Sequence, residues 1–430
     1  MESPAAKFDL PAFLMLMLSG LGLLGILTAA AGLAAAGLLA LLAGGVLGDQ
    51  ALSMLSLAWA AVFFVLLLLP SLANAFIRLL NLNRPLFGLP HRLRLASLLM
   101  LFFPALVILG DFLASQSSLS WILLPPLQVL VTVIPIWWIF EVGRHGLEMS
   151  ERRRGWGLIS FNILINQPFI LIAEIVLLLI LVALAVLWLA NRPELLGELQ
   201  RMVRRVTDAG MDPAALQRMF LPFLRNPFVL LGILALAAGL VPLMEELLKP
   251  LALWGLIGDR LSAVDGFVGG MLCGATFALM ETLGNLANPL GGSWAAVVVG
   301  RFGTALLHIT TSGLVGWGLA SALTGGKFTR LGAAYLLAAS LHSLWNVFGV
   351  LIGISPLIDG TGVSSGFVVL NQRLGNVAPL AMVVLAVTLF LILITSNHHL
   401  RLAPCLADED EAVEAVEPAE PAQPAARIMN

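Results

Sequence analysis

Eight polar or charged side chains lie inside strongly apolar segments in the second half of this sequence. They are Glu245, Glu246, Lys249, Glu281, Arg301, His308, His342 and Asn346. A charged side chain at the centre of a bilayer costs about 2.5–3.5 kcal/mol on insertion scales, so these side chains are not expected to face lipid. They predict instead a polar site inside a bundle of membrane-spanning helices.

The types of these side chains suit the activation of water for hydrolysis. A buried glutamate can act as a general base, and histidines can orient a water molecule. Glu245 and Glu246 both stay candidates for the base, because adjacent residues point about 100° apart on a helix and only one can face a given point. The Asn346 amide can donate a hydrogen bond to a developing oxyanion. Glu281 is either a catalytic partner or a support for one.

Two cationic residues are expected to support the site rather than react. Lys249 follows Glu245 by four residues and Glu246 by three, so it can pair with either of them on one helical face. Arg301 is the other candidate counter-ion. The acid that does not face the reacting water is therefore expected to pair with Lys249 or Arg301.

His308, His342 and Glu281 also form a candidate metal-binding set. Two histidines and one glutamate are a known ligand set of catalytic zinc, with an open position for water. The sequence has no His-Glu-x-x-His motif. The residue types therefore allow zinc as a cofactor, but the spacing does not require it.

The segments that carry these residues belong to a chain with the composition of a membrane protein. Of its 430 residues, 59% are hydrophobic and 11% are charged, and the mean hydropathy is +0.98; soluble domains average about 25% charged residues. A spanning helix needs about 20 apolar residues. The sequence predicts an all-α, polytopic transmembrane helix bundle of about ten spans, at residues 11–45, 52–77, 96–115, 121–141, 157–190, 226–257, 266–288, 294–322, 331–354 and 376–397.

These spans divide the chain into five regions. They are an N-terminal membrane region of five spans (1–191), an extracytoplasmic loop with amphipathic interfacial helices (192–225), the region of the candidate site (226–355), a loop with the last span (356–397) and a disordered acidic tail (398–430).

Loop charges predict the orientation of the spans. If both chain termini are cytoplasmic, the cytoplasmic loops contain most of the lysine and arginine residues that lie in loops. Such loops usually face the cytoplasm. At about 1.5 Å per helical residue, Glu245, Glu281, His308, His342 and Asn346 then all lie roughly 16–22 Å from the cytoplasmic ends of their spans. We therefore expect a multi-pass protein of the cell membrane, with the lipid bilayer as a partner. Nothing in the sequence indicates binding to nucleic acid.

Four motifs around these residues together resemble the PrsW family of intramembrane proteases, which is related to the type II CAAX prenyl endopeptidases. They are the run Glu245-Glu246-Leu247-Leu248-Lys249, the stretch from Gly266 to Glu281, the stretch from Arg301 to His308 continuing to Gly313, and His342-Ser343-Leu344-Trp345-Asn346. The second motif often continues with asparagine after the glutamate, whereas here Thr282 follows Glu281.

The resemblance implies hydrolysis of a peptide bond within or beside the membrane, in a membrane-anchored protein substrate. In PrsW-like proteins the substrates are anti-sigma factors. In the CAAX relatives a glutamate-activated water, two histidines and an asparagine oxyanion donor are proposed. Carried over, Glu245 or Glu246 is the base, His308 and His342 are assisting residues or ligands, and Asn346 is the oxyanion donor.

A proton- or ion-coupled transporter is the main alternative, because intramembrane Glu, His and Arg residues also serve as relays. Transporters often carry paired repeats with polar sites in both halves. Here the first half offers mainly Glu174, which is expected to form a hydrogen bond between helices. This asymmetry favours a localised catalytic site. An inactive relative that serves as a scaffold or immunity protein is a third hypothesis.

Overall fold

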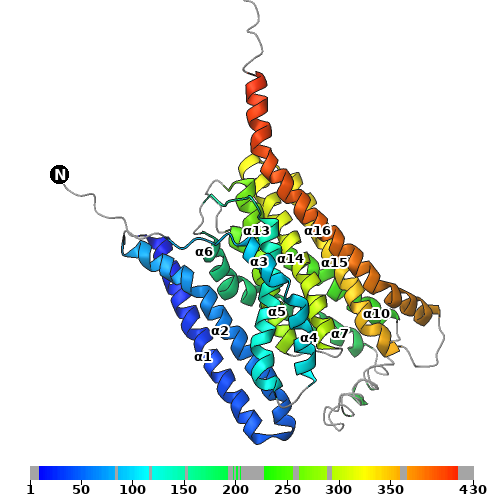
Figure 1. Ribbon diagram of the computed structural model, residues 1–430. Coiled ribbons are helices and arrows are strands. Elements are labelled where there is room, and N and C mark those ends of the chain that lie inside the picture. Colours follow the sequence, from blue (N-terminus) through cyan, green and yellow to red (C-terminus); the bar gives the residue numbers. More distant parts are fainter. Residues whose placement is uncertain are drawn as a thin grey trace, which may run out of the picture.

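The computed structural model describes residues 9–82, 86–115, 119–150, 154–191, 197, 200–201, 204, 227–254, 261–287, 293–358 and 366–414. Within these residues the fold consists of helices and contains no strand (Figure 1). The all-α prediction is confirmed. The predicted amphipathic loop at 192–225 falls almost entirely outside the described residues, and so does the end of the tail from residue 415.

The described helices follow one another along the chain in this order: α1 (Leu10–Ala43), α2 (Gly45–Leu79), α3 (Leu93–Met100), α4 (Phe103–Ala114), α5 (Ser120–Gly143), α6 (Arg154–Phe161), η1 (Asn162–Asn166), α7 (Gln167–Ala190), α10 (Pro227–Ala235), η2 (Leu236–Leu240), α11 (Val241–Leu248), α12 (Leu251–Trp254), α13 (Ala263–Ala287), α14 (Trp294–Gly325), α15 (Phe328–Ile358) and α16 (Gly366–Glu414). The segments η1 and η2 are single π-helical turns.

Nine of the described helical segments are long and apolar enough to cross a membrane. A tenth is formed if α3 and α4, which meet at a bend of 45°, count as one broken span. This confirms the expected number of about ten, and the bent pair corresponds to the predicted span at 96–115. Helices suit these segments because every backbone polar group must find a partner inside the segment when water is absent.

The central pair of helices is α13 and α14, and small residues bring them close together. A Cβ atom at Gly270 would lie 2.1 Å from the Ser312 carbonyl oxygen, and one at Gly274 would lie 2.1 Å from the His308 carbonyl oxygen. Glycines spaced by four residues allow this close approach of helix backbones in a membrane. In the most apolar window of each of these two helices 78% of the residues are buried, against 17% for α1. The pair therefore forms the interior of the bundle.

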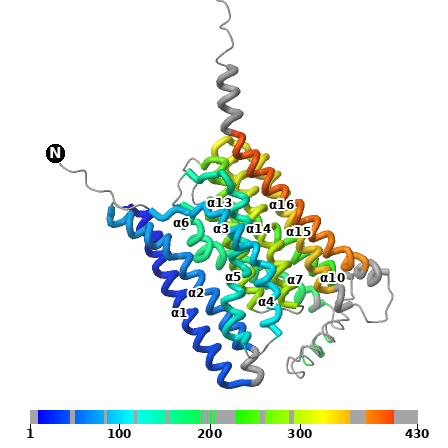
Figure 2. Tube along the Cα trace, in the orientation of Figure 1, coloured from blue at the N-terminus to red at the C-terminus, as the bar shows by residue number. Residues whose placement is uncertain are grey.

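The N-terminal hairpin of α1 and α2 lies at one side of the bundle, and α16 lies at the opposite side (Figure 2). The start of α1 and the C-terminal end of α16 lie at the same end of the molecule, at the top of Figure 1. Helix α16 continues to Glu414, beyond residue 397, where the last span was expected to give way to a disordered tail.

Two long spans are interrupted by π-helical turns. The span predicted at 157–190 consists of α6, η1 and α7, and the span predicted at 226–257 consists of α10, η2, α11 and α12. A π-helical turn leaves backbone groups of a span without their usual partners and often lies near a functional site. Pro250 adds a break between α11 and α12, because it has no N–H for the Glu246 carbonyl.

Candidate active site

Elements far apart in the sequence bring the predicted site residues together. Helix α11 and its C-cap supply Glu245, Glu246 and Lys249; α13 supplies Glu281; α14 supplies Arg301 and His308; and α15 supplies His342 and Asn346. Direct contacts connect all of these side chains except that of Asn346.

Lys249 lies at the centre of these contacts and is fully buried. Its Nζ lies 3.0 Å from Glu245 Oε2, 2.7 Å from Glu246 Oε1 and 2.9 Å from His308 Nδ1. The ammonium group also lies 4.3 Å from the centre of the Phe277 ring, a favourable cation–π distance. The sequence left open which acid pairs with Lys249, and the structure pairs it with both.

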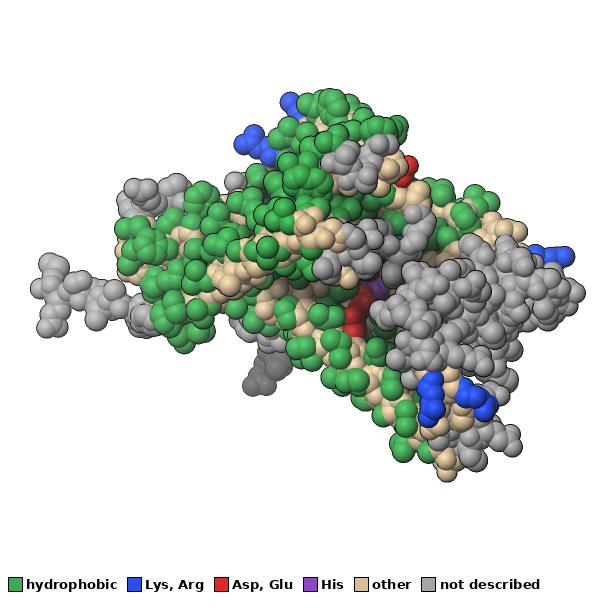
Figure 3. Space-filling view, turned by 90° about the horizontal axis from the view of Figure 1, so that it is seen from below, with side chains coloured by type: hydrophobic (Ala, Val, Ile, Leu, Met, Phe, Trp, Pro, Cys, Tyr) green, Lys and Arg blue, Asp and Glu red, His purple; other side chains and the backbone are tan. Residues whose placement is uncertain are grey.

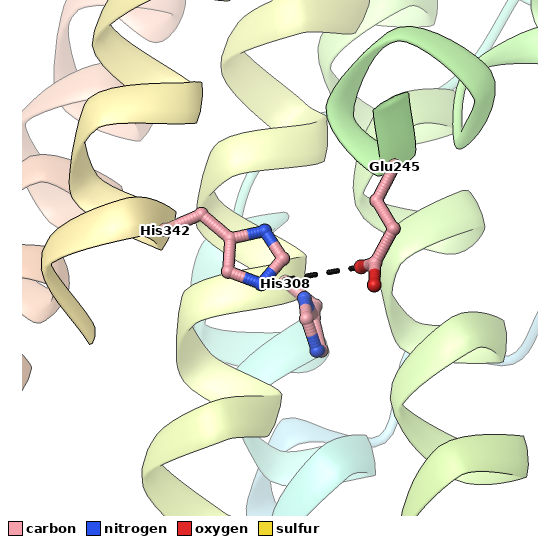
Figure 4. A group of neighbouring side chains, drawn as sticks. All are labelled: Glu245, His308 and His342. Carbon is pink, nitrogen blue, oxygen red and sulfur yellow. Dashed lines mark ion pairs between the residues drawn. The ribbon is translucent and has the colours of Figure 1, made fainter. Parts of the chain in front are cut away.

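Glu246 holds one of the two histidines. Its Oε1 atom lies 2.8 Å from His342 Nδ1, while His342 Nε2 lies 3.9 Å from Glu245 Oε2. Figure 4 shows Glu245, His308 and His342 converging from three different helices. Because Glu246 is 0% exposed and bonded to both Lys249 and His342, it is the more constrained of the two adjacent acids.

Glu281 holds the other histidine. Its Oε2 atom lies 2.9 Å from His308 Nε2 and 2.6 Å from an Arg301 guanidinium nitrogen. Arg301 Nε donates to the Thr282 hydroxyl at 3.2 Å. Arg301 is therefore a counter-ion as expected, but its acid is Glu281. Thr282, which stands where the family motif often has asparagine, braces that arginine.

Asn346 lies one helical turn after His342 but contacts a different group. Its Nδ2 donates to the Ala237 carbonyl of η2 at 2.8 Å. Tyr335 on the same helix donates its hydroxyl to the Leu243 carbonyl at 2.9 Å. Helix α15 thus supports the irregular segment that leads into Glu245 and Glu246.

The site opens toward one end of the bundle. Seen from below, acidic and histidine side chains are visible at the edge of the apolar surface (Figure 3). The Glu281 side chain is 37% exposed, whereas the Glu245 side chain is 9% exposed and that of Lys249 is 0% exposed. The site is therefore graded, with Lys249 in the interior and Glu281 nearest to the opening.

Glu245, His308 and His342 fit a metal ion in type and position. One ligand atom from each lies within 4.8 Å of the others, and all three residues are buried. A histidine that binds a metal usually donates the N–H of its other ring nitrogen to a carboxylate. Here Glu246 contacts Nδ1 of His342, and Glu281 contacts Nε2 of His308. This set contains Glu245 in place of the expected Glu281. Because Lys249 Nζ lies near Glu245 Oε2 and His308 Nδ1, the ammonium and a metal ion compete for the same atoms.

Two residues of the N-terminal membrane region also reach the site. Glu174 of α7 lies beside Glu245, close enough for the two side chains to interact. Asn166 of η1 donates to the Lys249 carbonyl at 2.8 Å. The sequence indicated Glu174 as a hydrogen-bonding residue between helices, without its partner. Asn166 was missed, and its only signal was a polar side chain in an apolar segment.

Residues 212–391 match the model of the PrsW family intramembrane metalloproteases. This segment carries a PrsW family domain. The match includes all eight predicted site residues and extends beyond the expected region 226–355 at both ends, and the family resemblance is thereby confirmed. No curated protein and no solved structure matches the chain at a significant level.

The PrsW match and the spanning helices together support a multi-pass membrane protein with intramembrane peptidase activity. Such an activity implies a protein substrate and the lipid bilayer as partners. The match favours the peptidase hypothesis over the transporter hypothesis. The family description also names a metal, for which the cluster of Glu245, His308 and His342 offers suitable donors.

Proposed function

We propose that this protein is an intramembrane endopeptidase in which Glu245 activates a water molecule. The observation that carries the proposal is the separation of 3.9 Å between Glu245 Oε2 and His342 Nε2. Polar atoms at such a separation are often bridged by one water molecule. The proposal is supported further by the PrsW match, which covers both residues.

The contacts of His342 set the orientation of this water. A neutral imidazole carries one proton, and we assign it to Nδ1, which donates to Glu246. The lone pair of Nε2 then faces Glu245. A water between them donates one O–H to Nε2 and the other to the Glu245 carboxylate. Its oxygen lone pairs are left to attack a carbonyl carbon.

The reaction then proceeds by general acid–base catalysis. Glu245 takes one proton from the water as its oxygen bonds to the carbonyl carbon, and the carbonyl oxygen becomes an oxyanion. The protonated Glu245 passes that proton to the leaving nitrogen as the C–N bond breaks. The products are a carboxylic acid, which ionises, and an amine.

The remaining site residues orient the reacting groups and stabilise their charges. Lys249 offsets the charges of Glu245 and Glu246, and Glu281 with Arg301 fixes the ring of His308. Asn346 gives one N–H to the Ala237 carbonyl, and its second N–H serves the oxyanion, a type of contact worth about 2.7–4 kcal/mol. With a metal ion such as zinc present, Glu245, His308 and His342 would instead hold the ion, which would supply Lewis-acid activation of water.

The substrate we propose is a membrane-anchored protein, resembling an anti-sigma factor as the family resemblance implies. The acidic and histidine side chains visible in Figure 3 are seen from the end of the bundle opposite the start of α1 and the end of α16. If these chain ends are cytoplasmic, as the loop charges predict, the site opens toward the extracytoplasmic side. Cleavage is then expected in the part of the substrate near that surface.

The test is cleavage of a single-span anti-sigma-factor reporter by the purified protein in lipid nanodiscs. E245Q and H342A are each expected to lower kcat by about 10²–10⁴-fold, the usual contribution of general acid–base catalysis. E141Q is the matched control, since Glu141 is also buried and ion-paired but contacts Arg144 instead of the site. It should cleave with nearly the wild-type kcat per folded molecule.

Equal cleavage by the wild type, E245Q and H342A would contradict the proposed site. Absence of cleavage, together with proton-dependent solute uptake into proteoliposomes that E245Q abolishes, would support the transporter hypothesis instead.

A further inference from the structure

The membrane region that precedes the PrsW match contributes a buried polar network to the site. Asn162 and Asn166 lie at the two ends of the π-helical turn η1, and both are 0% exposed. Asn166 Nδ2 lies 2.8 Å from Asn162 Oδ1 and 2.8 Å from the Lys249 carbonyl oxygen. A buried amide in an apolar bundle is costly unless such partners are present.

The Lys249 carbonyl needs this partner because the helix breaks at that point. In a continuous α-helix it would accept the N–H of Leu253. Here Leu253 N–H bonds the Pro250 carbonyl at 2.8 Å instead. Asn166 therefore acts as a C-cap for α11 that a distant segment of the chain supplies.

The same network connects the break to the central helix pair. Asn162 Nδ2 donates to the Leu158 carbonyl at 2.8 Å and to Cys273 Sγ of α13 at 3.3 Å. The chain of contacts thus runs from α13 through Asn162 and Asn166 to the backbone of Lys249. It fixes the end of α11 relative to the helix that carries Glu281.

We propose that Asn166 is a positioning residue that holds Lys249, and through it Glu245, Glu246 and His308, in the reactive arrangement. This inference rests on the proposed peptidase function. Lys249 contacts all three of these side chains within 3.0 Å, so a shift of its backbone moves several reacting groups together. A misplacement of about 1 Å can cost about 10²-fold in rate.

The experiment compares N166L with N397L. Leucine removes the amide while keeping a similar size. Asn397 is a matched control, because it is buried and donates to the carbonyls of Gly143 and His145, each at 2.9 Å, at the end of α5. N166L should lower kcat by about 10–100-fold with little change in KM. N397L should lose a similar amount of thermal stability and keep kcat close to that of the wild type.

A second measurement reads the position of Lys249 without relying on catalysis. A small amine-reactive reagent is applied in nanodiscs, and the modified lysines are identified by mass spectrometry. Lys249 is 0% exposed and should stay unmodified in the wild type and in N397L, but become modified in N166L. The exposed Lys327 should react in all three proteins.

The outcomes separate this proposal from the peptidase proposal. If N166L keeps the kcat of N397L, or if Lys249 stays protected in N166L, Asn166 has only a structural role and the inference is overturned. If the wild type cleaves no substrate but Lys249 becomes reactive only in N166L, the peptidase proposal fails and the positioning of Lys249 stands.

Discussion

Two buried charge clusters of this bundle are built in different ways. Glu141 and Arg144 form a pair three residues apart on one helix end, where Trp137 also donates to Glu141 and the Pro90 carbonyl accepts from Arg144. The cluster around Lys249 instead joins side chains of α11, α13, α14 and α15.

The two clusters also differ in the balance of their charges. The pair on α5 contains one carboxylate and one cation. The ion-paired residues of the site are the three carboxylates of Glu245, Glu246 and Glu281 and the two cations Lys249 and Arg301, with two histidines beside them. Glu174 adds a further carboxylate beside Glu245. A cluster with surplus carboxylate can take up a proton or a metal ion, as the proposed hydrolysis requires. The matched pair of Glu141 and Arg144 has no surplus charge, and it stabilises the end of α5.

The largest effect on this comparison is expected from K249M. The variant leaves three carboxylates of the site with Arg301 as their cation, and breaking a buried pair typically costs about 3–5 kcal/mol. The loss of orientation at Glu245 and His308 should also lower kcat by about 10²-fold. Denaturation curves and cleavage kinetics measure the two effects separately.

R144M is the counterpart in the other cluster. It should cost a similar free energy of unfolding, about 3–5 kcal/mol, while the folded fraction cleaves with nearly the wild-type kcat. A fall in kcat as large as that of K249M would show that the two clusters do not differ in function.

A smaller effect is expected for metal affinity in E246Q. Glu246 holds His342 Nδ1, and loss of such an outer carboxylate typically lowers metal affinity by about 10–100-fold. Zinc content after dialysis against a series of zinc buffers measures the change. E141Q should bind zinc as the wild type does; an equal loss in E141Q would place the metal elsewhere or make its binding nonspecific.

The smallest effect is expected from Y335F. Tyr335 braces the segment before Glu245 through one hydrogen bond to the Leu243 carbonyl, and such a bond contributes about 0.5–1.5 kcal/mol. Thermal unfolding should show a loss of this size, and kcat should change by less than about threefold, the equivalent of 0.65 kcal/mol. A fall in kcat as large as that of K249M would show that Tyr335 contributes to the reaction itself and not only to the support of the site.

The sequence was sufficient to predict the spans and to single out seven polar side chains that contact one another in the structure. Long apolar runs such as that of α5 specify helices wherever backbone groups must be satisfied without water. His308 and Lys249 were identifiable because their cost in lipid is high enough to require a protein environment. The four motifs, taken in order along the chain, were sufficient to indicate the family.

Only the tertiary structure decided which of these side chains meet. Periodicity along one helix cannot set its rotation against another, and here the rotation depends on the close contacts of Gly270 and Gly274 with α14. That packing pairs Arg301 and His308 with Glu281. The arrangement of the other helices puts Glu245, rather than Glu281, in the possible metal-binding set with both histidines, and it brings Asn166 to a carbonyl 83 residues away. Hydropathy records how costly a residue is in lipid, whereas the partner that offsets the cost depends on the three-dimensional arrangement of the helices.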